Sequence, residues 1–231
     1  MEEETGRVPW SLRESFLVLM ALLAAGIIGG LLTRFSYLST NLLNSYLLVG
    51  LAQAVAGLGG LYYFIQVKYG LGLQALGLKT TNWEQALTKG IGAGVLLFVS
   101  VIFVGGILQN FLPAAEPQPF AELIINARQP NDLIIPLLIG VILAPVTEEL
   151  CFRGFLFPVL KERYGTFAGI SGSSILFGLM HFDLLRFLPL MVGGMGLAYF
   201  YNRTGNILVS ITAHATWNAI MIFLLNISLQ W

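Results

Sequence analysis

Long apolar segments, separated by short polar connections, run along almost the whole chain. About 20 consecutive apolar residues cross the hydrocarbon core of a bilayer as an α-helix. The pattern predicts about seven transmembrane helices, the fifth and sixth of them short, at residues 16–33, 42–65, 90–112, 132–163, 166–182, 187–201 and 207–229. We therefore expect an all-α fold, a polytopic helical bundle surrounded by lipid.

The composition supports a membrane location for the whole chain. Of the 231 residues, 56% are hydrophobic and 10% are charged, and the mean hydropathy is +0.79. Such a chain is too apolar for an ordinary water-soluble domain. The 12 basic and 12 acidic residues cancel, so no overall positive charge points to a nucleic-acid partner. No shift in composition divides the sequence, and we expect a single integral membrane domain over residues 1–231.

The connections between the apolar segments predict an orientation and one extra helix. Residues 1–15 are expected to be solvated or interfacial, and the segment is too acidic for a signal peptide. Residues 113–119 read as a proline-rich loop, and residues 120–125 as a short interfacial helix. With seven spans, eight Lys and Arg residues fall on the side of the N-terminus and three on the other, leaving out Arg153. This bias predicts a cytoplasmic N-terminus.

Small residues within the spans indicate close helix packing. Gly26 with Gly30, and Gly90 with Gly94, have the four-residue spacing that lets membrane helices approach one another. We expect these contacts to be internal. The single cysteine, Cys151, excludes an intramolecular disulfide and a four-cysteine zinc site. We expect it to be a small buried residue.

Three charged residues interrupt the fourth span. Glu148, Glu149 and Arg153 lie within six residues of one another in an apolar helix. A charged side chain at this depth costs roughly a few kcal/mol at least, so such groups usually face a protein interior or a wet cavity. Residues four apart share a helical face, so Glu149 is predicted to form a structural ion pair with Arg153. Glu148, about a quarter turn away, remains without a partner in its own helix.

The chain has only two histidines, His181 and His214, and both lie in apolar segments. Asn218 follows His214 by four residues and shares its helical face. If the chain reverses near residues 164–165, Glu148 and His181 both lie about 24 Å from the turn, at 1.5 Å per residue. They are then at the same depth, whereas His214 needs a tilt of its helix or a longer loop to reach that layer.

A carboxylate, two imidazoles and a carboxamide in apolar surroundings can form a hydrolytic centre. Glu148 can take the proton of a water molecule, and His181 can help to position or deprotonate that water. His214 and Asn218 can donate hydrogen bonds to the oxygen that becomes negative when a peptide carbonyl is attacked.

Three other interpretations use the same residues. His181, His214 and either Glu148 or Glu149 could bind Zn²⁺ with a metal-bound water as nucleophile. The helical HExxH signature of zinc proteases is absent, so we favour the metal-free mechanism and assign no cofactor. The polar residues could instead serve packing in a scaffold or immunity protein. A proton-coupled transporter is disfavoured, because the polar clusters lie only in the C-terminal half and no repeat is visible.

Three motifs follow one another on the C-terminal spans: Glu-Glu-x-x-x-Arg at 148–153, Phe-x-x-x-His at 177–181 and His-x-x-x-Asn at 214–218. In this order they resemble the CAAX protease and bacteriocin-processing family of intramembrane proteases. That family includes the Ras-converting CAAX prenyl endopeptidase and the bacterial Abi proteins. The resemblance covers residues 132–229, a CAAX-protease-like catalytic core.

The resemblance implies a role for each polar residue and a kind of substrate. Glu148 would activate water with His181 beside it, and His214 with Asn218 would form the oxyanion pair. Glu149 and Arg153 would support the site. The substrate implied is a protein or peptide at the membrane. Family members that cleave prenylated CAAX proteins remove the last three residues after the modified cysteine.

Overall fold

The computed structural model describes residues 8–35, 42–79, 82–111 and 118–227. All regular elements in these residues are helical, which confirms the predicted all-α fold. The α-helices are α1 (Leu12–Phe35), α2 (Leu42–Tyr62), α3 (Trp83–Leu108), α4 (Pro119–Ile125), α5 (Ile134–Leu137), α6 (Ala144–Glu149), α7 (Phe157–Leu179), α8 (Phe187–Thr204) and α9 (Ile207–Ile227). Short π or 3₁₀ segments are η2 (Tyr63–Lys68), η3 (Leu73–Leu76), η4 (Pro130–Leu133), η5 (Leu138–Leu143) and η6 (Leu150–Leu156).

Within the part of the chain that the structure describes, five helical segments are long and apolar enough to cross a membrane: Leu12–Phe35, Leu42–Lys68, Trp83–Leu108, Pro130–Leu179 and Ile207–Ile227. The fourth is 50 residues long and reverses at Gly165, whose φ of 86° lies in the left-handed region that glycine favours. Beyond the turn, Gly169 packs directly against the backbone of Lys161. With this segment divided at Gly165 and α8 added, the structure contains the seven predicted helical segments.

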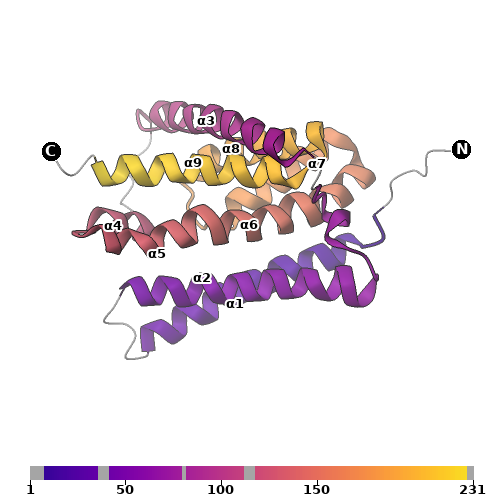
Figure 1. The fold of residues 1–231 in the computed structure, drawn as a ribbon, viewed down its shortest axis with the longest axis horizontal. Helices are drawn as coiled ribbons and strands as arrows, with labels where there is room; N and C mark the ends of the chain where they lie inside the picture. The colour runs from indigo at the N-terminus through magenta and orange to yellow at the C-terminus, as the bar shows by residue number, and fades with distance from the viewer. Residues whose placement is uncertain (1–7, 36–41, 80–81, 112–117, 228–231) are drawn as a thin grey trace, which may run out of the picture.

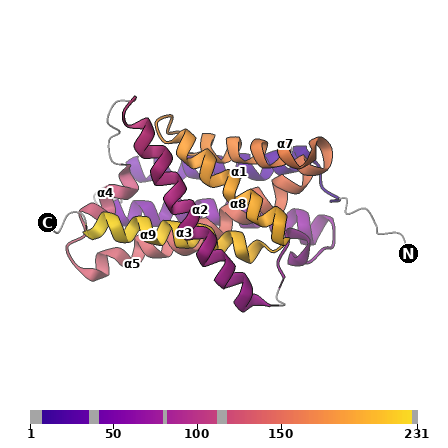
Figure 2. The same cartoon turned by 90° about the horizontal axis from the view of Figure 1, so that it is seen from above.

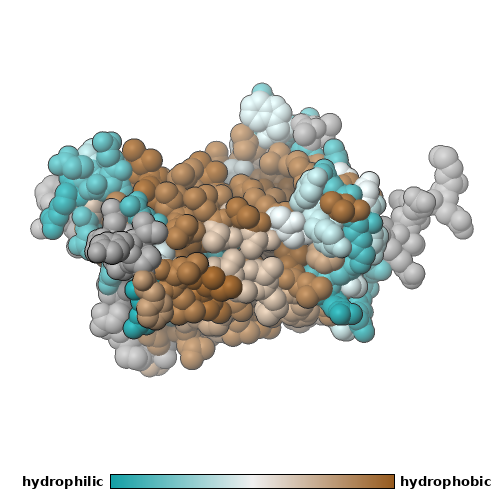
Figure 3. Space-filling model, turned by 90° about the horizontal axis from the view of Figure 1, so that it is seen from below, coloured by the Kyte–Doolittle hydropathy of each residue, from teal (hydrophilic) through white to brown (hydrophobic). Residues whose placement is uncertain are grey.

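The helices lie side by side along the long axis of the molecule (Figure 1). The α1–α2 hairpin lies on one side, the helices α3, α8 and α9 lie on the other, and the run from α5 to α6 passes between them. Seen at right angles, α3 crosses over α8 and α9 (Figure 2). Hydrophobic residues form a broad central band with hydrophilic residues at both ends (Figure 3). This distribution fits a bilayer whose normal follows the long axis.

The close contact between α3 and α9 depends on glycine. A Cβ atom at Gly94 would lie 2.5 Å from the carbonyl oxygen of Ala213, and one at Gly90 would lie 2.9 Å from that of Val209. Any side chain at these two positions would force the helices apart. The pair Gly90 and Gly94 therefore makes an internal contact, as the sequence predicts.

The start of α1 differs from the expectation of a solvated or interfacial segment. Trp10 is 3% exposed; its Nε1 donates to the carbonyl oxygen of Phe155 at 2.8 Å, and the two rings stack at 4.8 Å. Ser11 and Glu14 form a capping box, in which Oε2 of Glu14 accepts from the Ser11 N–H at 2.6 Å. Glu14 also pairs with Lys68 at the end of η2. Trp10 and Glu14 are thus buried in the protein rather than solvated, because of long-range partners that the sequence does not reveal.

Two connections can be compared with their predictions. Residues Pro119–Ile125 form α4, so the short helix predicted at 120–125 is confirmed as a helix. The third long helix begins at Trp83, earlier than the predicted residue 90. The predicted loop at 113–119 lies almost wholly outside the described residues.

Asp183 fixes the loop between α7 and α8, which also carries His181. Its Oδ1 accepts from the Arg186 N–H at 3.0 Å, and its Oδ2 accepts from Nε2 of Gln118 at 2.9 Å. Burial opposes ionisation of the Asp183 carboxyl, but the hydrogen bonds from Arg186 and Gln118 outweigh it and hold its pKa below the ordinary value. The ionised form of Asp183 therefore stabilises the loop.

We expect Asp183→Asn to lower the free energy of unfolding at neutral pH by about 1–2 kcal/mol, because a charge-assisted hydrogen-bond acceptor is lost. A carboxyl whose folded-state pKa is lowered stabilises the protein above its unfolded-state pKa and loses this effect as the pH falls through the folded-state value. Thermal unfolding in detergent across a pH series should show the two proteins converging in acid. A difference that stays constant with pH would contradict this account.

Candidate active site

The helical run that carries the acidic residues is not a regular α-helix. Two π-helical stretches, Leu138–Leu143 and Leu150–Leu156, flank the short helix α6, Ala144–Glu149. Pro145 lies in the first turn of α6, where its missing N–H leaves a carbonyl of the preceding stretch without the usual partner. A π-helical turn changes the register of the hydrogen bonds and rotates the side chains that follow, and such turns are frequent at functional sites.

Glu149 is the centre of a buried polar cluster. Its carboxylate is 0% exposed, and its Oε1 accepts from Nη1 of Arg153 at 2.8 Å. Nδ1 of His214 lies 2.9 Å from the same oxygen; because a carboxylate only accepts, that nitrogen carries a hydrogen. The hydroxyl of Ser210 donates to Oε2. The ion pair predicted between Glu149 and Arg153 is present, and α9 supplies two further partners.

Arg153 ties this cluster to α7 and α8. It is fully buried, and its Nη2 donates to the carbonyl oxygen of Gly194 at 3.0 Å. Gly194 has no side chain to block this approach. The guanidinium carbon lies 4.5 Å from the ring centroid of Phe177, a cation–π contact. Nε of Arg153 is buried without a hydrogen-bond partner, so its environment is only partly satisfied.

His214 lies between the two glutamates. Its Nδ1 faces Glu149, and its Nε2 lies 3.9 Å from Oε2 of Glu148. The imidazole is 5% exposed, and its ring packs against Trp217 and Phe177 with centroids 5.7 and 5.8 Å apart. With the proton on Nδ1, a neutral imidazole can accept through Nε2; in the imidazolium form both nitrogens donate. The ring can therefore exchange a proton on the side of Glu148.

Glu148 is in a different environment from its neighbour. Its side chain is 23% exposed, against 0% for Glu149. It lines a cavity of about 60 Å³ between α1, α2, η5 and α6. The two adjacent carboxylates therefore differ, as predicted: Glu149 has three polar partners, and Glu148 lines this cavity.

His181 reaches the cluster through Phe177. The ring of Phe177 lies 4.9 Å from that of His181 and 5.8 Å from that of His214, so both imidazoles contact the same aromatic side chain. Nδ1 of His181 is 2.8 Å from the carbonyl oxygen of Phe177. His181 itself is exposed and lies in the turn that follows α7. Among the described residues, no hydrogen bond or ion pair joins His181 directly to Glu148.

Asn218 lies one turn beyond His214 on α9 and is partly buried. Its Nδ2 donates to the carbonyl oxygen of Gly140 at 2.7 Å. Gly140 belongs to η5, where the π-helical register alters the usual hydrogen bonds. One of the two amide hydrogens of Asn218 therefore holds α9 to η5, and the second remains available.

The alternative zinc site receives no geometric support. Among the described residues, no three His, Cys, Asp or Glu side chains form a group that could hold a metal ion. In particular, the set Glu148, His181 and His214 is not gathered around one point. We therefore derive no chemical step through zinc.

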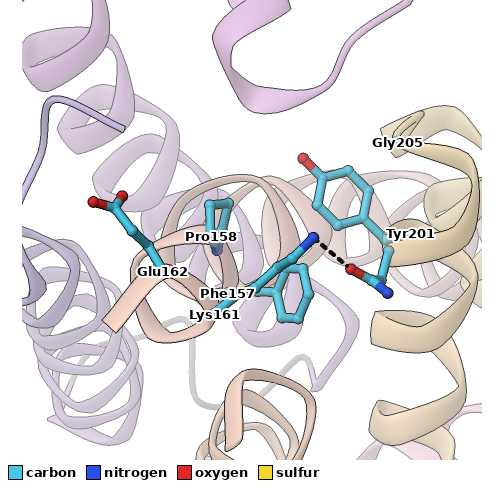
Figure 4. Close-up of a pocket in the computed structure, with 7 residues that line it drawn as sticks. Phe157, Pro158, Lys161, Glu162, Tyr201 and Gly205 are labelled. Carbon is cyan, nitrogen blue, oxygen red and sulfur yellow. Dashed lines mark hydrogen bonds between the residues drawn. The ribbon is translucent and has the colours of Figure 1, made fainter. Parts of the chain in front are cut away.

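A larger hollow, of about 320 Å³, lies at the end of the bundle between the start of α7 and the end of α8 (Figure 4). Nζ of Lys161 donates to Oδ1 of Asn202 at 2.8 Å across it. None of the predicted site residues lines this hollow. It is separate from the buried cluster.

Three parts of the cluster were not predicted from the sequence. Ser210 precedes His214 by four residues on the same face, and this spacing was the signal that could have found it. Gly194 contributes a backbone carbonyl, which leaves no trace in sequence. Phe177 was singled out only as the first position of the Phe-x-x-x-His motif, but it is 1% exposed and contacts Arg153 and both imidazoles.

Fold and site together define a polytopic helical membrane protein with a buried carboxylate–imidazole centre. Residues 130–220 match the family model described as "Type II CAAX prenyl endopeptidase Rce1-like". This range contains the three sequence motifs at 148–153, 177–181 and 214–218. The C-terminal region of the chain is thus similar to the Rce1-like family, which confirms the resemblance seen in the sequence.

Two curated proteins are also similar to this chain. The "Putative membrane peptidase YdiL" of Bacillus subtilis (strain 168) is 28% identical over 142 residues, which are 58% of this chain and 57% of that protein. An "Uncharacterized 24.3 kDa protein" of Escherichia coli is 31% identical over 129 residues, 54% of this chain and 57% of its own length. The chain thus spans a little over half the length of each relative. No solved structure matches it significantly.

We expect Arg153→Met to destabilise the protein by about 3–5 kcal/mol, because it leaves the carboxylate of Glu149 buried without its compensating charge. The double variant Glu149→Leu with Arg153→Met should recover part of this loss, since no unpaired charge remains. Thermal unfolding in detergent measures both effects. Arg163→Met is the control, because Arg163 is exposed near the α7 turn and its loss should change stability by less than about 0.5 kcal/mol. Equal stability of Arg153→Met and the unaltered protein would contradict a structural ion pair.

Proposed function

We propose that this protein is an intramembrane endopeptidase in which Glu148 activates a water molecule. The proposal is supported chiefly by the position of His214, 2.9 Å from Oε1 of Glu149 and 3.9 Å from Oε2 of Glu148. Glu149 is saturated by Arg153, Ser210 and His214, so it is poorly suited to accept another proton. Glu148 borders a cavity and keeps its lone pairs available, which is what a general base requires.

The proposed reaction is the hydrolysis of a peptide bond. Glu148 takes a proton from water as the water oxygen attacks the peptide carbonyl carbon, and the carbonyl oxygen becomes negative. When the C–N bond breaks, the proton passes from Glu148 to the leaving amine. The products are a carboxyl group and an amine, with Glu148 ionised again.

The negative oxygen in this reaction needs hydrogen-bond donors. In the imidazolium form, His214 can donate to that oxygen through Nε2 while Nδ1 keeps its hydrogen bond to Glu149. Asn218 can donate through its second amide hydrogen. His181 would position or deprotonate the water, a role that requires its exposed ring to turn toward Glu148.

We propose a peptide held at the membrane as the substrate class. The family description names a CAAX prenyl endopeptidase, and one relative carries the name of a membrane peptidase. A farnesylated peptide ending in a CAAX sequence is therefore the first probe, and the same peptide without the farnesyl group is the second. Cleavage of the first alone would indicate a prenylated substrate, whereas cleavage of both would indicate a wider peptide specificity.

We expect Glu148→Gln and His214→Ala to lower the cleavage of these probes in proteoliposomes by at least about 100-fold, because each removes a group that acts on the reacting atoms. Release of the C-terminal fragment can be followed by mass spectrometry, and thermal unfolding checks that the variants are folded. Glu84→Gln, an exposed carboxylate at the start of α3, is the matched control and should cleave normally. Full activity of Glu148→Gln would reject the site. Loss of stability without a defined loss of turnover would favour a scaffold protein instead.

The mechanism makes a separate prediction about metal. We expect the purified protein to cleave the probe after dialysis against a chelator, because the described residues gather no zinc ligand set. Metal analysis of the same preparation should find zinc well below one ion per chain. Stoichiometric zinc, together with activity that the chelator removes and added zinc restores, would establish the metal-dependent mechanism.

A further inference from the structure

The cavity beside Glu148 is lined on one side by the α1–α2 hairpin, which lies outside residues 130–220, the region that matches the family model. Its lining residues are Leu22, Gly50, Gln53, Ala54, Ile139, Leu143, Ala144, Thr147 and Glu148. Three of these carry polar side chains, and the others are apolar. Gln53 comes from α2, and Thr147 and Glu148 come from α6, so the polar groups face the cavity from two separate elements.

Thr147, which lines the cavity, has a hydroxyl group whose hydrogen-bonding capacity is not satisfied by the described residues. The residue is 3% exposed, and its Oγ1 is buried without a hydrogen-bond partner in the described structure. Its methyl group points at α2, where a Cβ atom at Gly57 would lie 3.0 Å from it. A buried hydroxyl without a hydrogen bond costs roughly 1–3 kcal/mol. Buried polar groups of this kind are usually satisfied by ordered water.

The cavity is large enough and polar enough for water. Its volume of about 60 Å³ exceeds the roughly 10–15 Å³ that one water molecule requires. Such a water also needs two to four polar partners. Glu148, Thr147 and Gln53 provide three such partners, and the other residues that line the cavity have apolar side chains or none.

Gln53 is held in place by the packing of α1 against α2. A Cβ atom at Gly26 would lie 2.7 Å from Nε2 of Gln53, so the carboxamide rests directly on the glycine backbone of α1. Gln53 is partly buried, and the carboxamide can both donate and accept. A polar residue that borders the same cavity as the proposed base, on an otherwise apolar wall, is placed to orient a water molecule.

We propose that Gln53 and Thr147 hold a water molecule against Glu148, which makes Gln53 a positioning residue for the hydrolysis. This inference rests on the proposed function, because it assumes that Glu148 is the base. The water donates one hydrogen to the Glu148 carboxylate. Hydrogen bonds with the Gln53 carboxamide and the Thr147 hydroxyl then fix the orientation of the water molecule. The α1–α2 hairpin thereby forms part of the active site.

The test compares two substitutions that remove hydrogen-bonding capacity with little change of shape. Gln53→Leu and Thr147→Val are assayed in proteoliposomes with the farnesylated CAAX peptide. We expect Gln53→Leu to lower kcat by about 10–100-fold and to leave KM within about twofold, because the water rather than the peptide loses its position. Thr147→Val should lower kcat by about tenfold, the effect of one hydrogen bond. Gln66→Leu, an exposed glutamine on η2, is the matched control and should behave as the unaltered protein.

Thermal unfolding provides a second measurement that needs no substrate. If the cavity holds water, Thr147→Val should not raise the melting temperature, since the water loses a partner. If the cavity is dry, the substitution removes an unsatisfied hydroxyl and should raise it. A higher melting temperature with unchanged kcat would overturn the inference.

The outcomes separate this inference from the proposed function. Normal kcat in Gln53→Leu, together with an inactive Glu148→Gln variant, would overturn the role of Gln53 and leave the protease assignment intact. An active Glu148→Gln variant would overturn both. A change in KM alone in Gln53→Leu would also reject the positioning role, because it would indicate a contact with the peptide.

Discussion

The structure of the site depends on one buried carboxylate. Glu149 has lost all contact with solvent, and such a charge persists in a protein interior only when its partners satisfy it fully. They come from two elements: Arg153 from η6, and His214 and Ser210 from α9. Through Arg153, the cluster extends to the carbonyl of Gly194 on α8 and to Phe177 on α7. One charge therefore fixes the relative positions of the helices that carry all the candidate catalytic groups.

The two adjacent glutamates can perform different tasks because the helix turns them in different directions. Glu149 points into the bundle and is saturated, whereas Glu148 lines the cavity and has Nε2 of His214 at 3.9 Å from its Oε2. His214 connects the two. A carboxylate that accepts from one ring nitrogen sets the tautomer, and the other nitrogen is left on the side of the proposed base. The stabilising group and the reactive group are thus neighbours in sequence with opposite environments.

Much of this arrangement could be predicted from the sequence, and what could not be predicted follows a physical rule. The apolar runs, the reversal near Gly165 and the pairing of Glu149 with Arg153 depend on local spacing, so they were predicted. The burial of Trp10 depends on Phe155, far along the chain. The π-helical stretches η5 and η6 depend on the packing of this helical run against other segments. Gly194 contributes only its backbone carbonyl, which accepts from Arg153. Such features arise only when distant segments meet, so one sequence does not reveal them.

The α1–α2 hairpin shows why a motif-bearing core is an incomplete description of the site. Residues 130–220 contain every motif, yet Glu148 borders a cavity whose opposite wall is α2. A base in open lipid would have no water to activate, and one open to bulk solvent would lose the low dielectric that strengthens its interactions. An apolar hairpin that forms one wall of the cavity limits the contact with both, provided that this wall carries a group able to hold water. Gln53 is the residue on that wall with the necessary chemistry, and the glycine at position 26 gives its carboxamide a surface to rest on.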